Sequence, residues 1–273
     1  MANTKKVEEV LMGRTKIEWC DRVWNPVWGC KTGCEYCYAR KIAKRFFKKI
    51  ADAEFEYRKR HNIETSPLTK PLLRAQIKQF EPIFMFKNYG KLLYPLKRLR
   101  IFVNSMSDIR WWKKEWMSFV LDKIERYPQH IFQFLTKFPG TYTKYKFPKN
   151  CWLGVTITYG ERRDVVLRRF LKNDNIKFIS FEPLLAEVFV DYFNNFEGEQ
   201  FPNWVIIGAQ TNPYKPPKRA WVEKIIKKAK ENNIPVFLKD NLFRAYPDLP
   251  KLQEFPNFPK LQELPKLEKI LGI

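Results

Sequence analysis

The chain repeats one apolar unit between residues 100 and 240, and this repetition limits the folds that it can adopt. Short apolar runs, each separated by enough chain for one helix, cover residues 101–103, 131–135, 152–157, 178–181, 204–208 and 235–238. Near-continuous apolar strands are typical of a parallel sheet covered by helices. A further strand is expected at 23–28, although Asn25 and Pro26 weaken that pattern. The sequence therefore predicts an α/β fold, a partial (β/α) barrel of parallel strands with outer helices.

Residues 1–245 are expected to form this barrel. Apolar positions at helical spacing predict helices over 112–126, 164–171 and 221–231. A basic insertion at about 50–95, rich in aromatic residues, is expected to cover the mouth of the barrel. Residues 246–273 repeat a Pro-Lys-Leu phrase at 250–252, 259–261 and 265–267. Because prolines at this density exclude a long helix, we expect an irregular Pro-rich tail that packs on the body.

Three of the five cysteines lie in one short loop, as Cys30, Cys34 and Cys37. A closed structural zinc site uses four ligands, and a ferredoxin-type loop has a fourth cysteine nearby. Three soft ligands that leave one corner of a metal centre open are therefore expected to serve catalysis. In the alternative interpretation, Cys20 closes the site around zinc as a fourth ligand. Cys151 stands just before a predicted strand and is expected to be a buried structural thiol.

Polar side chains follow the predicted strands. The ligand site of a parallel (β/α) barrel lies at the C-terminal ends of its strands. The cysteine loop follows the first strand, and the later strand ends supply Asn104, Ser105, Ser107, Asp108, Thr136, Thr156, Glu182, Gln210 and Lys239. We expect these side chains to face the cysteines. A capping or turn role is the alternative for each of them; Asp108 could cap a helix before Arg110, and Lys239 could pair with Glu182.

The net charge is +22, from 51 Lys and Arg against 29 Asp and Glu. A field of that sign attracts polyanions, so DNA or RNA is the expected partner. A Lys-rich surface of the kind found in heat-adapted proteins is the alternative. No apolar run approaches the roughly 20 residues that span a membrane, and the start of the chain lacks the apolar core of a secretory signal. With cysteines that form no disulfide pattern, these features predict a cytoplasmic protein without membrane contact.

The cysteine spacing, with the aromatic Tyr36 directly before Cys37, resembles that of the radical S-adenosylmethionine superfamily. This resemblance implies that Cys30, Cys34 and Cys37 hold a 4Fe-4S cluster whose open iron binds S-adenosylmethionine. An electron, from a donor such as a ferredoxin or flavodoxin, would then generate a 5′-deoxyadenosyl radical. It also implies that Glu182, Lys239 and Cys20 act on the substrate, Cys20 as a hydrogen donor. Cofactor contacts are assigned to Tyr36, Asn104, Ser105, Ser107, Asp108, Thr136, Thr156 and Gln210.

The chain is also similar to a phage-associated three-cysteine family of bacteria and archaea whose function is uncharacterised. Matching segments run in order through residues 15–19, 24–27, 34–39, 101–108, 135–137, 152–155, 182–185, 204–208 and 235–239. Members of that family usually have a longer loop between the first two cysteines, and Thr in place of Cys20. Where they tend to show Gly-Gly-Glu-Ser, this chain has Gly-Ala-Gln-Thr at 208–211, so a carboxylate is missing at Gln210.

These expectations converge on a radical S-adenosylmethionine enzyme that modifies or repairs nucleic acid, with a DNA-lesion lyase as one version. Two alternatives stay open. The first is a non-enzymatic nucleic-acid-binding protein that structural zinc stabilises through Cys20, Cys30, Cys34 and Cys37. The second is a radical enzyme that acts on a small molecule or a peptide, with the positive charge as a thermal adaptation.

Overall fold

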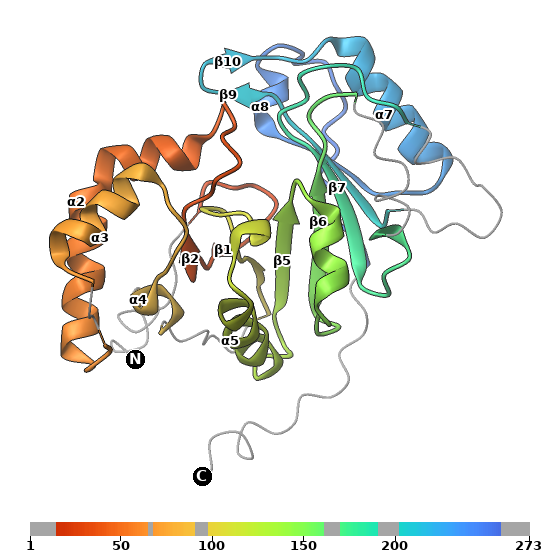
Figure 1. The fold of residues 1–273 in the computed structure, drawn as a ribbon. Coiled ribbons are helices and arrows are strands. Elements are labelled where there is room, and N and C mark those ends of the chain that lie inside the picture. The colour runs from red at the N-terminus through yellow and green to blue at the C-terminus, as the bar shows by residue number, and fades with distance from the viewer. Residues whose placement is uncertain (1–14, 65–67, 91–97, 161–169, 191–201, 258–273) are drawn as a thin grey trace, which may run out of the picture.

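A curled parallel sheet of seven strands forms a half-barrel at the centre of the protein (Figure 1). The computed structural model describes residues 15–64, 68–90, 98–160, 170–190 and 202–257. The strand order is β1-β4-β5-β6-β7-β8-β11. The bounds are Arg22–Val23 for β1, Arg100–Phe102 for β4, Ile131–Thr136 for β5, Cys151–Thr156 for β6, Ile176–Phe181 for β7, Trp204–Ile207 for β8 and Val236–Leu238 for β11. The predicted fold class and its later strands are confirmed.

Helices cover the outer face of this sheet. Helix α5 (Lys114–Glu125) turns Met117, Val120, Leu121 and Ile124 toward the strands, and α7 (Arg219–Glu231) does the same with four apolar residues. Short helical segments complete the layer: α8 (Asp240–Phe243) and two 3₁₀ segments, Ile109–Trp111 and Pro139–Lys144. The helices predicted at 112–126 and 221–231 are confirmed, whereas most of the one predicted at 164–171 lies outside the described residues.

The inner face of the half-barrel is filled with aromatic side chains. Trp19, Phe102, Trp152, Phe178, Trp204 and Phe237 form one buried cluster with Cys20, Ile131 and Ile206, here called the inner cluster. Gly154 lies opposite Phe178 in the register of β6 and β7. A Cβ atom at Gly154 would lie 2.2 Å from the Phe178 ring, so the glycine makes room for that ring. Because the lower barrel is filled in this way, open space is left at the C-terminal ends of the strands.

The first predicted strand, 23–28, is split in two, which corrects the sequence-based expectation. Strand β1 ends at Val23, and β2 (Val27–Trp28) leaves the main sheet to pair antiparallel with β3 (Ile83–Phe84). Asn25 lies between them, and its side-chain oxygen accepts hydrogen bonds from Ser105 Oγ and Met106 N, both at 3.0 Å. Pro26, which cannot donate to a sheet ladder, follows directly.

The region predicted as an insertion is a helical hairpin beside β1. Helix α2 (Tyr38–Arg60) continues past the expected boundary near residue 50, and α3 (Lys70–Gln79) packs against it through Ala51, Leu73 and Ile77. A short helix, α4 (Phe86–Tyr89), follows β3. The buried carboxylate of Glu54 ties α2 to α4 through hydrogen bonds from Phe86 N and Lys87 N. The hairpin therefore stands at the side of the half-barrel and does not cover its mouth (Figure 1).

The described part of the tail closes the β11 edge of the sheet. Leu238 N donates to Leu252 O at 2.7 Å, and Glu254 N donates to Val236 O at 3.1 Å. The Phe255 ring packs on Trp204, with centroids 5.2 Å apart. Residues 246–257 thus pack on the body, and the rest of the predicted tail lies outside the described residues. A two-stranded hairpin, β9 (Gln210–Thr211) and β10 (Tyr214–Lys215), follows β8. In the described ranges, no helix has the length and apolar character of a membrane span.

Candidate functional site

A pocket of about 530 Å³ opens at the C-terminal ends of the parallel strands. Its wall is built from the cysteine loop, the first turn of α2, the segment after β4 and the ends of β5, β6, β7 and β11. Every residue that the sequence assigned to the site, except Cys20, lines this pocket. The topology explains this convergence, because parallel neighbours end at the same edge of a sheet.

Two backbone features fix the cysteine loop. Gly29 has φ +97°, and a Cβ atom there would lie 2.1 Å from Glu81 O, so only glycine allows this close approach to the segment before β3. The neighbouring amide, Cys30 N, donates to Phe80 O at 2.9 Å. At the other end of the loop, Cys37 is the N-cap of α2, and its sulfur accepts from Arg40 N at 3.4 Å.

The three sulfurs face one pocket, and their surroundings differ. Cys30 Sγ lies 3.1 Å from Thr32 Oγ1 and accepts from Thr32 N at 3.4 Å. Thr32 Oγ1 in turn accepts from Trp111 Nε1 at 2.9 Å. Burial raises the pKa of the Cys30 thiol, an effect that a bound metal ion reverses. Across the described residues, no three His, Cys, Asp or Glu side chains stand close enough together to form a ready-made metal site.

The segment after β4 shapes the pocket wall with side chains that already have hydrogen-bond partners. The Asn104 side chain donates to Leu135 O at 2.7 Å and accepts from Leu135 N at 3.0 Å. Ser105 donates to Asn25, and Ser107 Oγ accepts from Trp112 Nε1 at 3.0 Å. These residues line the pocket, but their polar atoms already bond to the surrounding protein.

Asp108 is held in the same way. Its carboxylate accepts from Thr136 Oγ1 at 2.6 Å, from Lys137 N at 3.0 Å and from Arg110 N at 2.9 Å. The last of these bonds is the capping role that the sequence left open. Burial raises the pKa of Asp108, although all three hydrogen bonds act against that shift. Asp108 and Thr136 therefore form a buried, hydrogen-bonded part of the pocket wall.

Glu182 and Lys239 form an ion pair on the wall opposite the cysteines. Burial by itself lowers the pKa of Lys239, but the Glu182 carboxylate outweighs it, and the pKa lies above its ordinary value. Glu18 adds a second carboxylate nearby, because it accepts from Asp240 N at 2.6 Å. Burial raises the pKa of Glu18. The pocket wall thus carries an ion pair formed at the ends of β7 and β11, with the Glu18 carboxylate close to it.

The remaining predicted residues, Tyr36, Thr156 and Gln210, also line the pocket. The Tyr36 ring lies under Lys137, whose nitrogen is 5.2 Å from the ring centroid, and burial raises the pKa of Tyr36. Thr156 ends β6 and is half-buried. Gln210 donates to Pro213 O at 2.9 Å within the β9–β10 hairpin.

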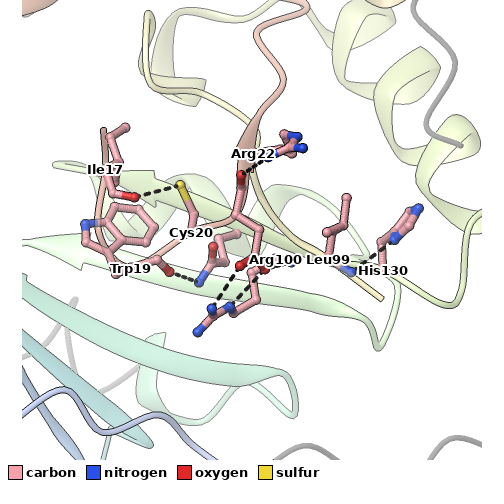
Figure 2. A network of polar contacts seen from close by, with 9 residues as sticks. Ile17, Trp19, Cys20, Arg22, Leu99, Arg100 and His130 are labelled. Atoms are coloured by element: carbon pink, nitrogen blue, oxygen red, sulfur yellow. Dashed lines mark hydrogen bonds and ion pairs between the residues drawn. The ribbon is translucent and has the colours of Figure 1, made fainter. Parts of the chain in front are cut away.

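Cys20 stands apart from the pocket. Figure 2 shows its thiol turned toward Ile17 O, with a sulfur–oxygen distance of 3.7 Å. The residue belongs to the inner cluster, and burial raises its pKa to about 12. Neither of its predicted roles, hydrogen donor in the pocket or fourth metal ligand, is supported by this position. Cys151 is buried at the start of β6, as expected.

The sequence interpretation missed several lining residues. Lys16, Ile17 and Trp19 line the pocket. Trp19 is buried, and within the described ranges its Nε1 atom has no hydrogen-bond partner. The signal that could have found them is the 15–19 segment, which contributed to the family resemblance but was assigned no site role. Tyr38 lines the pocket as well, directly after Cys37.

A family model described as "Protein of unknown function (DUF5131)" matches residues 14–244. All pocket-lining residues fall inside the matched range, whereas the segment along β11 at 250–255 falls outside it. No curated protein and no solved structure matches the chain significantly.

Proposed function

Given that the chain belongs to the DUF5131 family of proteins of unknown function, we propose that it is a radical S-adenosylmethionine enzyme. One observation carries this proposal. Cys30, Cys34 and Cys37 line the same pocket as the C-terminal ends of the parallel strands. Three thiols without a fourth ligand match a centre that keeps one coordination position for another molecule.

The donor set fits an iron–sulfur cluster, because thiolates are the ligands that such clusters prefer. Cys30, Cys34 and Cys37 would hold the cluster, which supplies the electron for reductive cleavage of S-adenosylmethionine. The pocket volume of about 530 Å³ lies within the range of roughly 300–1,000 Å³ that is typical of small-molecule sites. Aromatic and apolar side chains at the pocket floor, Trp19 and Phe102 among them, keep water out of such a reaction.

The wall opposite the cysteines supplies the polar contacts. Lys239 and Glu182 offer a cation and a carboxylate to the charged ends of a bound molecule.

Nucleic acid is the substrate class that we propose for this enzyme. The net charge of +22 attracts polyanions, and the first half of α2, which begins at the pocket, carries six Lys and Arg and no Asp or Glu. A small molecule or a peptide would require no such surface. The zinc-binding alternative needs Cys20 as a ligand, but the Cys20 thiol is buried, bonds to Ile17 O and does not line the pocket.

The test uses protein purified without oxygen and reduced with dithionite. S-adenosylmethionine is added with and without single-stranded DNA or RNA, and 5′-deoxyadenosine is measured by chromatography. We expect 5′-deoxyadenosine from the unaltered protein and none from Cys34→Ala, which also loses iron. Cys20→Ala is the matched thiol control and is expected to keep its iron. Zinc in place of iron, bound only while Cys20 is present, would contradict the proposal.

A further inference from the structure

An exposed apolar stripe runs along α2 from the rim of the pocket. Tyr38, Ile42 and Phe46 are exposed by 47%, 37% and 44%. They are spaced four residues apart, so they lie on one face of the helix. The stripe is about 12 Å long at 1.5 Å per residue. Its first member, Tyr38, also lines the pocket.

Tyr38 is held as a fixed platform. Its hydroxyl donates to Ser105 O at 2.7 Å, while the side chain remains nearly half exposed. This bond holds the hydroxyl end of the ring against the segment after β4, while much of the ring is open to solvent. A ring fixed in this way loses little conformational entropy when a flat partner stacks on it.

Positive charge accompanies the stripe on the same part of α2. Lys41, Arg45, Lys48 and Lys49 are exposed, and among the described residues no carboxylate forms an ion pair with them. At 3.6 residues per turn, Arg45 and Lys49 lie directly beside the stripe. The Arg45 guanidinium stacks on the Phe46 ring at 5.1 Å from its centroid. The acidic residues of α2 lie in its second half, where Asp52 pairs with Arg74 and Glu56 pairs with Lys70.

We propose that this face of α2 binds a single-stranded nucleic acid and leads one of its bases into the pocket; the inference rests on the proposed function. Exposed rings next to unpaired cations suit a strand whose bases are free to stack while its phosphates meet Lys and Arg. A duplex offers its phosphates but not its base faces. An enzyme that acts on a base must also take that base out of the duplex, and a pocket of about 530 Å³ is too small to admit a duplex.

The test measures binding of fluorescein-labelled oligonucleotides of one sequence, as single-stranded DNA, single-stranded RNA and duplex DNA, to the anaerobic cluster-loaded protein. Fluorescence anisotropy is followed over a range of salt concentrations. We expect tighter binding of a single strand than of the duplex, and the DNA and RNA samples identify the preferred sugar. Phe46→Ala is expected to weaken single-strand binding by about 5- to 150-fold. Phe119→Ala, which removes an equally exposed ring on α5, serves as the matched control.

Charge is tested separately from stacking. Lys48→Gln combined with Lys49→Gln is expected to reduce the slope of log affinity against log salt by about 1.4, or 0.7 for each lost phosphate contact. Lys227→Gln combined with Lys230→Gln, two exposed lysines on α7, is the control and leaves the slope unchanged. All variants alter exposed side chains, and circular dichroism verifies that they fold.

Two results would overturn the inference: equal affinity for single strand and duplex, or equal effects of the α2 variants and their controls. The proposed function is tested independently, because 5′-deoxyadenosine formation is measured on the unaltered protein. If binding of a single strand depends on the stripe but no 5′-deoxyadenosine forms, the α2 binding surface is supported and the radical enzyme proposal is contradicted. If 5′-deoxyadenosine forms but binding does not depend on the stripe, the radical enzyme proposal is supported and the α2 binding surface is contradicted.

Discussion

Lys239 at the end of β11 donates to the carboxylate of Glu182 at the end of β7. Gly208 follows β8, the strand that lies between these two in the sheet. A Cβ atom at Gly208 would stand 2.9 Å from Lys239 Cδ and 3.1 Å from Glu182 Cγ. The glycine therefore leaves the space in which the two side chains meet. Residues that are 57 apart in the sequence share one wall of the pocket for this reason.

Removal of one partner of this ion pair is expected to destabilise the protein strongly. Lys239→Gln leaves Glu182 largely buried without its cation, which costs about 3 kcal/mol. Urea unfolding of Lys239→Gln, Glu182→Gln and the double variant gives the coupling free energy, and the double variant is expected to cost less than the sum of the two. Lys224→Gln, which breaks the exposed pair with Glu187, should cost less than about 1 kcal/mol. Similar costs for Lys224→Gln and Lys239→Gln would contradict the prediction.

Substitution of Gly29 is expected to disturb the cysteine loop. In Gly29→Ala, the new Cβ atom meets Glu81 O, and the left-handed backbone adds strain. We expect a loss of at least about 2 kcal/mol of stability and fewer iron atoms bound per chain. Gly33→Ala is the control, because Gly33 also has a positive φ but its Cβ would meet no atom closer than 4.0 Å. Its cost should be that of backbone strain alone, about 1 kcal/mol. Equal losses of iron in both variants would rule out the close contact as the cause.

The Thr32 hydroxyl is expected to raise the reduction potential of any cluster that Cys30 holds. Trp111 Nε1 donates to Thr32 Oγ1, which leaves the hydroxyl proton free to point at the Cys30 sulfur 3.1 Å away. Hydrogen bonds to a ligand sulfur raise the reduction potential of an iron–sulfur centre. Thr32→Val should therefore shift the midpoint potential to a more negative value, and Trp111→Phe should shift it less in the same direction. Potentiometric titration followed by electron paramagnetic resonance measures both, and an unchanged potential in Thr32→Val would contradict the prediction.

Acid is expected to weaken the contact between β1 and β4. Burial alone would raise the pKa of Asp21, but the hydrogen bonds from Arg100 outweigh it and hold the pKa below its ordinary value of 3.8. Near pH 3.8 the native state thus binds fewer protons at Asp21 than the unfolded chain does. The stability that the Asp21–Arg100 pair contributes is therefore present above pH 3.8 and is lost as the pH falls further. Asp21→Asn should lose up to about 1 kcal/mol at neutral pH and less as the pH approaches 3. Unfolding by urea across this range measures the difference, and a constant difference would exclude the pair as its source.

The sequence determined most of the half-barrel. The apolar runs from 101 to 238 became β4, β5, β6, β7, β8 and β11, because a strand covered on both faces must be apolar throughout. The spacing of Cys30, Cys34 and Cys37, and the polar residues after each strand, identified about half of the residues that line the pocket. Parallel strands must end at one edge, so this step needed no tertiary information.

Tertiary structure alone decided what each pocket residue contacts. Asn104 and Asp108 look free in the sequence, yet their polar atoms bind the neighbouring strand and its loop. Cys20 lies ten residues from Cys30 in the sequence but packs in the inner cluster, beside Trp19 in the segment that precedes β1. The local pattern of apolar residues predicts where a strand lies in the sequence, whereas the hydrogen-bond partners and the burial of a side chain depend on residues far away along the chain. The predicted chemistry of the cysteine loop came from sequence spacing, and the basic character of α2 is also plain in the sequence. The exposure of Tyr38, Ile42 and Phe46 along one face of that helix was decided by the fold.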